Sequence, residues 1–193
     1  MAYETTGRVG QKGRTRDALV AAARELLALG GAPTVESVAE AAGISRTTAY
    51  RYFSSTDDVL RAAPPEIELS TLLPPDAPQD VETRLGLVLD QHFRIIREWE
   101  PQLRASLAVS LRPGSAAPPL RGGRAITWVA DALSPLSDSL DVRDLAVRIR
   151  SVAGIEPFVW LVDVAGLSRR AAFATMRENA YAVLAAATTS DLR

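Results

Sequence analysis

Residues 34–53 read TVESVAEAAGISRTTAYRYF, and this stretch decides the fold of the N-terminal part of the chain. Its first half repeats apolar residues at helical spacing and stops at Gly43, which permits the left-handed backbone of a tight turn. Thr34 precedes this first helix and Ser45 precedes the next, and both residue types favour helix N-caps. The second helix extends to Phe53. The stretch therefore predicts two short helices, at 35–42 and 45–53, joined by a glycine turn.

The second of these helices carries side chains that suit the major groove of DNA. Ala49 and Phe53 fall on the face that points into the core, whereas Thr47, Tyr50 and Arg51 share the opposite arc, with Arg46 in the first turn. Arginine can pair with guanine edges, threonine reaches thymine methyl groups or phosphates, and tyrosine hydroxyls bind phosphate. The positive end of the helix that begins after Thr34 also suits a phosphate. Any one of these residues alone is more simply a solvated side chain, so the prediction rests on the whole pattern.

The segment 15–60 resembles the DNA-binding domain of the TetR family, in which A-x-x-A-G-[VI]-S precedes Y-x-[YH]-F at this spacing. The resemblance implies a homodimer whose reading helices enter successive major grooves of a pseudo-palindrome, about 34–36 Å apart. Carried over by position, it implies that one set of residues approaches base edges and a second holds phosphates. The first set is Arg46, Thr47, Thr48 and Arg51; the second is Thr34, Tyr50 and Tyr52; Ser45 completes the predicted DNA site. Two departures from the family pattern are Thr56, where lysine is common, and the small Ala49.

Composition limits the remaining possibilities. The chain has 193 residues, a net charge of −1 and no cysteine, which excludes disulfides, thiolate nucleophiles and cysteine-bound zinc. Because the net charge is so small, basic residues that bind DNA must be placed locally, as in the first sixteen residues. These hold Arg8, Lys12, Arg14 and Arg16 against Glu4 alone. The start lacks the apolar core of a signal peptide and the longest apolar stretch, 158–167, is too short to span a bilayer, so we expect a cytoplasmic protein.

Helical periodicity continues through the chain and predicts an all-α fold of about nine helices. We expect a flexible basic arm at residues 1–13, which either reaches a minor groove through Arg8 or Lys12 or is a disordered tail. A helix-turn-helix DNA-binding domain follows at 14–63, and a larger helical ligand-binding and dimerisation domain at 64–193. The first helix is expected near 14–29, and a fourth from Thr56, after an S-x-x-D capping box, to the Pro64-Pro65 pair. Later helices are expected at 81–98, 102–112, 123–133, 141–165, with a kink at Pro157, and 168–187.

The last two expected helices suggest how the protein dimerises. Residues 158–164 are apolar nearly all round the helix, so several sides of this helix must be covered. The last helix carries a matching apolar stripe, formed by Phe173, Met176, Ala180, Val183 and Leu184. The short link Gly166-Leu167-Ser168 makes the two helices an antiparallel pair. We therefore expect a homodimer through these helices, as the family resemblance also implies. The alternative is that both helices form the core of a monomer.

The family resemblance also implies a pocket for a small-molecule effector in the C-terminal domain. Its candidate lining is His92, Phe93, Ile96, Trp99, Trp128 and Phe158. Few charged residues interrupt these stripes, which favours a largely apolar or aromatic effector. The alternative for each aromatic residue, and for the lone histidine, is ordinary core packing.

Enzyme motifs are missing from the sequence. There is no P-loop, H-E-x-x-H or G-x-S-x-G motif, and we predict no catalytic residue, metal site or cofactor. A second alternative is a helical partner-binding protein with a degenerate DNA-binding module. The favoured interpretation is a transcriptional regulator that a ligand releases from its operator, and repression rather than activation is the commoner role in the family.

Overall fold

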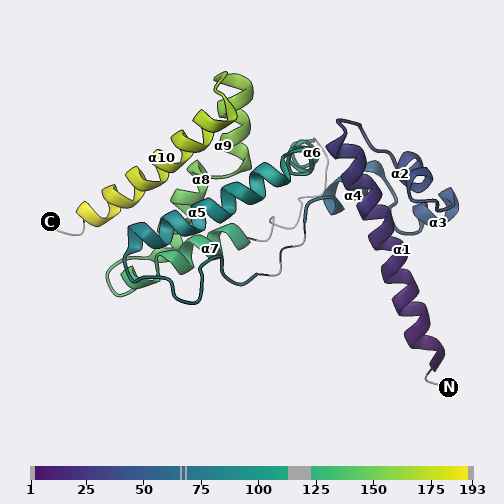
Figure 1. The fold of residues 1–193 in the computed structure, drawn as a ribbon, viewed down its shortest axis with the longest axis horizontal. Helices are drawn as coiled ribbons and strands as arrows, with labels where there is room; N and C mark the ends of the chain where they lie inside the picture. The colour runs from purple at the N-terminus through teal and green to yellow at the C-terminus, as the bar shows by residue number, and fades with distance from the viewer. Residues whose placement is uncertain (1–2, 66, 68, 113–122, 191–193) are drawn as a thin grey trace. The chain divides into compact units, whose positions relative to one another are not determined.

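The computed structural model describes residues 3–65, 67, 69–112 and 123–190, and every regular element within these ranges is helical (Figure 1). The all-α prediction is therefore confirmed. The helices form two compact units. The first unit holds α1 (Tyr3–Ala28), α2 (Val35–Ala41), α3 (Arg46–Tyr50), α4 (Thr56–Ala62) and all of α6 (Glu100–Ser110) except its first residue. The second holds α5 (Val81–Glu98), α7 (Arg124–Ala132), a 3-10 turn (Ser134–Leu136), α8 (Val142–Val152), α9 (Ile155–Val159), a π-helical turn (Trp160–Val164) and α10 (Arg169–Ser190).

In the first unit, α2, α3 and α4 gather around the C-terminal half of α1, and the other half of α1 extends away from them (Figure 1). The buried core joins Leu19 and Ala23 of α1 to Val38, Ala49 and Val59. α1 begins at Tyr3, whereas the sequence predicts a flexible arm up to residue 13. No proline interrupts this segment, each glycine costs only about 1 kcal/mol, and a helix whose C-terminal half is packed can extend one hydrogen bond at a time.

α6 belongs to the first unit by packing. Its Val109 is fully buried with Leu27, Leu60 and Ala63, and Gln102 Nε2 donates to a carbonyl of α1 at 3.0 Å. The sequence places all residues from 64 onward in one domain, and the structure differs at this helix. The reason is that α6 buries the apolar residue of its last turn against α1 and α4, which periodicity alone does not reveal.

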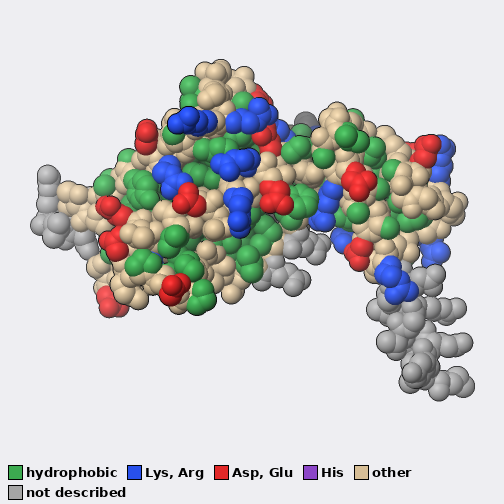
Figure 2. Space-filling view, viewed as in Figure 1, with side chains coloured by type: hydrophobic (Ala, Val, Ile, Leu, Met, Phe, Trp, Pro, Cys, Tyr) green, Lys and Arg blue, Asp and Glu red, His purple; other side chains and the backbone are tan. Residues whose placement is uncertain are grey.

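In the second unit, α5, α7, α8 and α10 enclose a core of fully buried aliphatic side chains. The bounds of α5 match the predicted 81–98, and Asp80 caps it by accepting from the backbone N–H of Thr83 at 2.8 Å. On the face drawn in Figure 2, acidic and basic side chains are interspersed over this unit. No helix in the described part of the chain combines the length and apolar character that crossing a membrane requires.

The predicted helix over 141–165 is interrupted, and the predicted kink at Pro157 is wrong. The break lies at Ala153 and Gly154, and Pro157 falls in the first turn of α9, where its missing N–H is not needed. A Cβ on residue 154 would lie 1.8 Å from Nη1 of Arg150, so only glycine leaves room for that guanidinium. Arg150 in turn pairs with Glu156 at 2.8 Å. Gly154 therefore allows the guanidinium of Arg150 to lie across the break.

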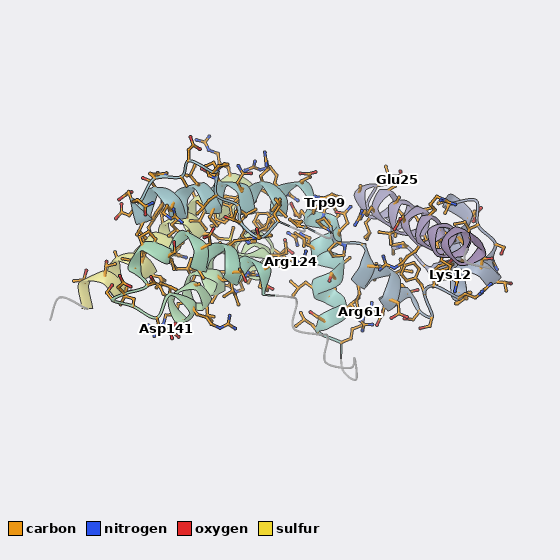
Figure 3. All side chains as sticks on the ribbon, turned by 90° about the horizontal axis from the view of Figure 1, so that it is seen from below. Lys12, Glu25, Arg61, Trp99, Arg124 and Asp141 are labelled. Carbon is orange, nitrogen blue, oxygen red and sulfur yellow. The ribbon has the colours of Figure 1, made fainter. Side chains whose placement is uncertain are left out.

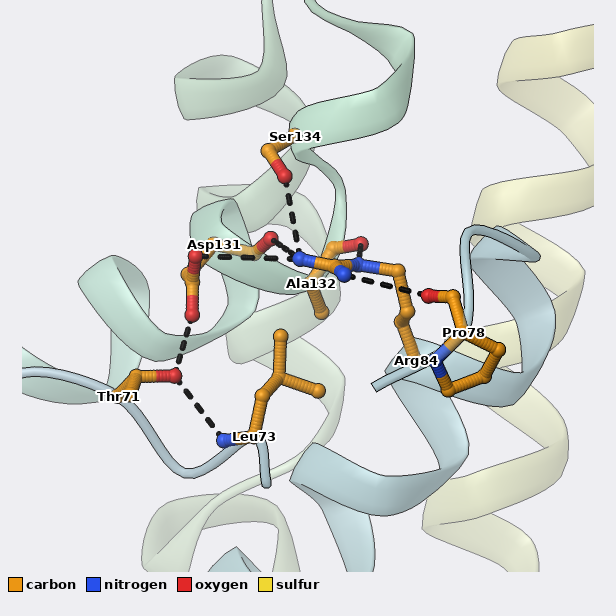
Figure 4. Close-up of polar contacts among 7 residues, drawn as sticks. All are labelled: Thr71, Leu73, Pro78, Arg84, Asp131, Ala132 and Ser134. Atoms are coloured by element: carbon orange, nitrogen blue, oxygen red, sulfur yellow. Dashed lines mark hydrogen bonds and ion pairs between the residues drawn. The ribbon is translucent and has the colours of Figure 1, made fainter. Parts of the chain in front are cut away.

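Arg84 fastens the connector before α5 to the end of α7 (Figure 4). Its side chain is only 8% exposed, and Nη1 donates to the carbonyl of Pro78 at 3.2 Å. Nε donates to the carbonyl of Ala132 at 3.0 Å, while Nη2 donates to that of Asp131 at 2.8 Å and to the Ser134 hydroxyl at 3.2 Å. The last carbonyls of a helix have no hydrogen-bond partner within the helix. The guanidinium of Arg84 supplies donors to these carbonyls at the end of α7 and also binds the connector before α5.

Candidate nucleic-acid interface

Thr34 caps α2, as the sequence predicts. The backbone N–H of Ser37 donates to Thr34 Oγ1 at 3.1 Å, and the backbone N–H of Thr34 donates to Ser37 Oγ at 2.9 Å. This reciprocal pair satisfies two N–H groups that the helix leaves unpaired. The Thr34 hydroxyl accepts in this cap, and the phosphate contact that the resemblance implies for Thr34 stays a prediction.

Gly43 makes the turn between α2 and α3. Its φ is +66°, and its N–H donates to the carbonyl of Glu40 at 3.1 Å. The next N–H, that of Ile44, donates to the carbonyl of Ala39 at 2.9 Å. These are the two hydrogen bonds of a Schellman motif, which ends a helix with a left-handed residue. Ile44 then packs against the core cluster of the unit and fixes the direction in which the chain enters α3.

Ser45 caps α3, which is shorter than predicted. The N–H of Thr48 donates to Ser45 Oγ at 3.3 Å, and Ser45 Oγ donates to Thr48 Oγ1 at 2.9 Å. The helix ends at Tyr50 and not at Phe53, because Arg51 and Tyr52 form a tight turn. Their N–H groups donate to the carbonyls of Thr48 and Ala49, three residues earlier. The S-x-x-D box predicted at α4 is one-sided: Ser55 Oγ accepts from the N–H of Asp58, whose carboxylate accepts instead from Ser54 Oγ at 2.5 Å.

α3 has the orientation that its pattern predicts. Ala49 is fully buried, and the side chains of Ser45, Arg46, Thr47, Tyr50 and Arg51 are exposed. Thr48 is half-buried, and Tyr52 is half-buried against the core. The structure therefore brings two arginines, a threonine and a tyrosine together on one exposed face, whereas Tyr52 lies beside the core.

Glu36 is a member of this surface that the sequence reasoning missed. The hydroxyl of Tyr50 donates a short hydrogen bond to Glu36 Oε1, which joins the first turn of α2 to the end of α3. This hydrogen bond is the main cause that lowers the pKa of the Glu36 carboxyl, and the nearby charge of Arg46 acts in the same direction. The same bond raises the pKa of Tyr50. Residues fourteen positions apart meet only because α2 and α3 cross, so no local sequence signal identifies the contact.

Of the six residues predicted to line an effector pocket, Phe93, Ile96 and Phe158 are core residues. Phe93 and Phe158 are buried on either side of Phe173, at ring-centroid distances of 5.2 and 4.8 Å, and Ile96 is 1% exposed. The structure adds Phe173, which the sequence analysis places only in the stripe of the last helix. Trp99 is half-buried at the end of α5 (Figure 3).

His92 and Trp128 have a different environment from the other aromatic residues. Their rings meet edge to face at 6.1 Å, and Trp128 Nε1 donates to the carbonyl of Leu69 at 2.8 Å. Both ring nitrogens of His92 are buried, and neither forms a hydrogen bond of normal geometry with the described residues. Burial, helped by the charge of Arg150, lowers the pKa of His92 to about 4. His92 is therefore a neutral polar group inside an apolar setting.

Two surface hollows of the second unit lie away from the predicted lining residues. One of about 550 Å³ runs between α8 and α10 and includes Asp144, Arg148 and Val183. Another of about 360 Å³ lies beside α5 and is mostly apolar, with lining from Leu69, Leu72, Leu73, Leu87 and Gln91 among others. Leu69 links the second hollow to Trp128 through its carbonyl.

The last two helices present apolar side chains to solvent as well as to their own core. Phe158 and Leu161 are buried, but Trp160 is 58% exposed and Val164 is 70% exposed. The stripe on α10 predicted for dimerisation, which includes Met176 and Leu184, faces the core of its own unit. The exposed apolar surface here therefore comes mainly from the π-helical turn.

Comparison with known families identifies the first unit. The family model described as "Bacterial regulatory proteins, tetR family" matches residues 19–63, which span the packed half of α1 together with α2, α3 and α4. No curated protein shows significant similarity to the chain.

Proposed function

We propose that this chain is a transcriptional repressor of the TetR type whose operator affinity is controlled by a small effector, since the tetR family model matches residues 19–63. The observation that carries the proposal is the exposed face of α3, with Arg46, Thr47 and Arg51, which two N-caps and the Gly43 turn hold in place. Family members are regulators and not enzymes. The near-neutral chain would bind DNA through this local surface and not through a global field.

Operator binding would use two copies of α3. A short recognition helix covers only part of a half-site, so a two-fold dimer on a pseudo-palindrome supplies the missing contacts. Trp160 and Val164 support a dimer contact at the π-helical turn, since large exposed apolar side chains that lie one turn apart favour burial against a partner. In a two-fold dimer the same patch of each protomer would meet its copy.

The proposed effector site centres on His92 and Trp128. Buried polar atoms are almost always hydrogen-bonded. The ring nitrogens of His92 form no hydrogen bond of normal geometry with the described residues, which favours a ligand that supplies a donor or an acceptor there. The apolar hollow at Leu69 and Leu87 offers a route from the surface, since Leu69 also binds Trp128. The effector would be a largely apolar or aromatic molecule, and binding would shift the population away from the DNA-binding state.

The proposal is tested by selecting bound sequences from a library of random duplex DNA with the purified full-length protein. Enrichment of a pseudo-palindromic consensus, with half-sites about one helical turn apart, is the expected result. Weak binding that enriches no sequence would contradict the proposal and would favour a partner-binding role for the second unit.

A further inference from the structure

The contact between Tyr50 and Glu36 alters what the DNA-facing surface can recognise. Tyr50 is 45% exposed and ends α3, and Glu36 lies in the first turn of α2. The tyrosine hydroxyl donates its hydrogen to Glu36 Oε1. Arg46, one turn before Tyr50 on α3, acts electrostatically on both groups. Glu36 is thus part of the same exposed surface as the predicted DNA-binding residues.

Counting donors shows the chemical consequence of this contact. A tyrosine hydroxyl has one hydrogen to donate, and an ionised carboxylate has none. Once Tyr50 donates to Glu36, the pair offers only oxygen acceptors and carries a negative charge. The lowered pKa of Glu36 and the raised pKa of Tyr50 keep the pair in this form at neutral pH.

In this arrangement the pair offers no donor to a DNA phosphate, which itself is anionic and accepts hydrogen bonds. The donors available to it in the major groove are the exocyclic amino groups, N4 of cytosine and N6 of adenine. This differs from the phosphate contact that the family resemblance implies for Tyr50. We propose that Glu36, positioned by Tyr50, reads the amino group of a cytosine or adenine and so determines one base of each operator half-site. This inference rests on the proposed function, since it needs α3 to lie in the major groove.

The contact could instead only brace α2 against α3. A brace would stabilise the fold without changing which sequences are bound. Base preference therefore separates the two roles, whereas affinity or stability alone does not.

The test repeats the selection from random duplex DNA with Glu36→Ala, Tyr50→Phe and a matched control, Glu40→Ala. Glu40 lies on the exposed side of the same helix, so the control makes the same change of charge and size. We expect wild type and Glu40→Ala to select one consensus, and Glu36→Ala to lose its preference at one position of each half-site by about tenfold, because alanine leaves no acceptor there. The base at that position in the wild-type consensus distinguishes cytosine from adenine. Tyr50→Phe should weaken the same preference, because the carboxylate loses the hydroxyl that positions it.

A second measurement uses the selected operator with the base at that position replaced by an analogue that lacks the amino group. Wild type should bind this operator about tenfold more weakly, and Glu36→Ala should bind both operators equally. An unchanged consensus for Glu36→Ala, or uniformly tighter binding of all sequences, would overturn the inference and leave the proposed function standing. Absence of any consensus for the wild type would overturn both.

Discussion

Nε of Arg84 donates to the main-chain carbonyl of Ala132 at 3.0 Å, and this bond joins the first turn of α5 to the end of α7. The same guanidinium also serves Asp131, Pro78 and Ser134. Arg84→Met keeps an unbranched apolar stem but leaves these buried carbonyls without a donor. We expect it to lower the free energy of unfolding by about 3 kcal/mol in urea denaturation. The matched control is Arg94→Met, an exposed position on the same helix, which should change it by less than about 0.5 kcal/mol. Equal effects of both substitutions would show that the Arg84 bonds contribute little.

Two glycine substitutions should have opposite signs. Gly43→Ala puts a side chain on a residue with φ +66°, where nothing lies within 4 Å of the new Cβ, so the backbone conformation alone opposes it. We expect a loss of about 1 kcal/mol of unfolding free energy, with weaker DNA binding because the turn orients α3. Gly13→Ala lies inside α1, also in open space, and should add about 0.5–1 kcal/mol. Thermal unfolding of the two variants beside wild type measures both effects, and stabilisation by Gly43→Ala would contradict the account of the turn.

His92 should make stability depend on pH in a range where few other groups titrate. Its pKa falls from 6.5 to about 4 on folding, chiefly through burial, while Glu156 and the backbone of Ala153 oppose the shift. Between pH 4 and pH 6.5 the unfolded chain binds more protons than the folded chain, so the free energy of unfolding rises with pH. The contribution of His92 to this free energy is complete above about pH 6.5 and is lost as the pH falls towards 4. We expect wild type to lose about 1 kcal/mol between pH 7.5 and 5.5, measured by urea denaturation at a fixed protein concentration.

The variant His92→Leu isolates this effect, because the chain has one histidine. Its stability should be nearly constant over the same pH range. Its stability should also match or exceed that of wild type at pH 7.5, because the substitution removes two buried ring nitrogens that form no hydrogen bond of normal geometry with the described residues. A pH dependence identical to that of wild type would show that another group is responsible.

The proposed dimer contact predicts that Trp160→Asp produces a monomer. Trp160 is 58% exposed in the single chain, and a buried carboxylate at the contact would remain unpaired. Light scattering at micromolar concentration should give the mass of two chains for wild type and of one chain for the variant. Leu111→Asp, a 74% exposed position in the first unit, is the control and should remain dimeric. A dimeric Trp160→Asp would place the interface elsewhere.

The parts of the fold that could be predicted from the sequence are those set by neighbouring residues. Thr34, Gly43 and Ser45 act through hydrogen bonds within four positions along the chain, so their identities alone predict the caps and the turn. The break before α9 could not be predicted in the same way. Proline at 157 is the stronger local signal, but the helix ends at Ala153 and Gly154, beside which the guanidinium of Arg150 lies.

The candidate sites show the same division. Helical periodicity predicts that α3 exposes Arg46 and Arg51, because it needs only the direction of one helix. It cannot predict the bond from Tyr50 to Glu36, which depends on how two helices cross. For the aromatic residues, periodicity identifies the buried face of each helix. Phe93 and Phe158 nevertheless pack against Phe173 and do not surround an opening. Whether a buried face encloses a cavity depends on tertiary packing.

The most direct test of the account is the affinity of Arg46→Ala for the selected operator, measured by fluorescence anisotropy at two salt concentrations with competitor DNA. If α3 reads the operator, this variant should lose about 1–3 kcal/mol of binding free energy and relax the preference at one base. Arg143→Ala, an equally exposed arginine on α8, should bind as wild type does. Equal affinities for wild type and both variants would contradict the claim that α3 is the DNA-reading element.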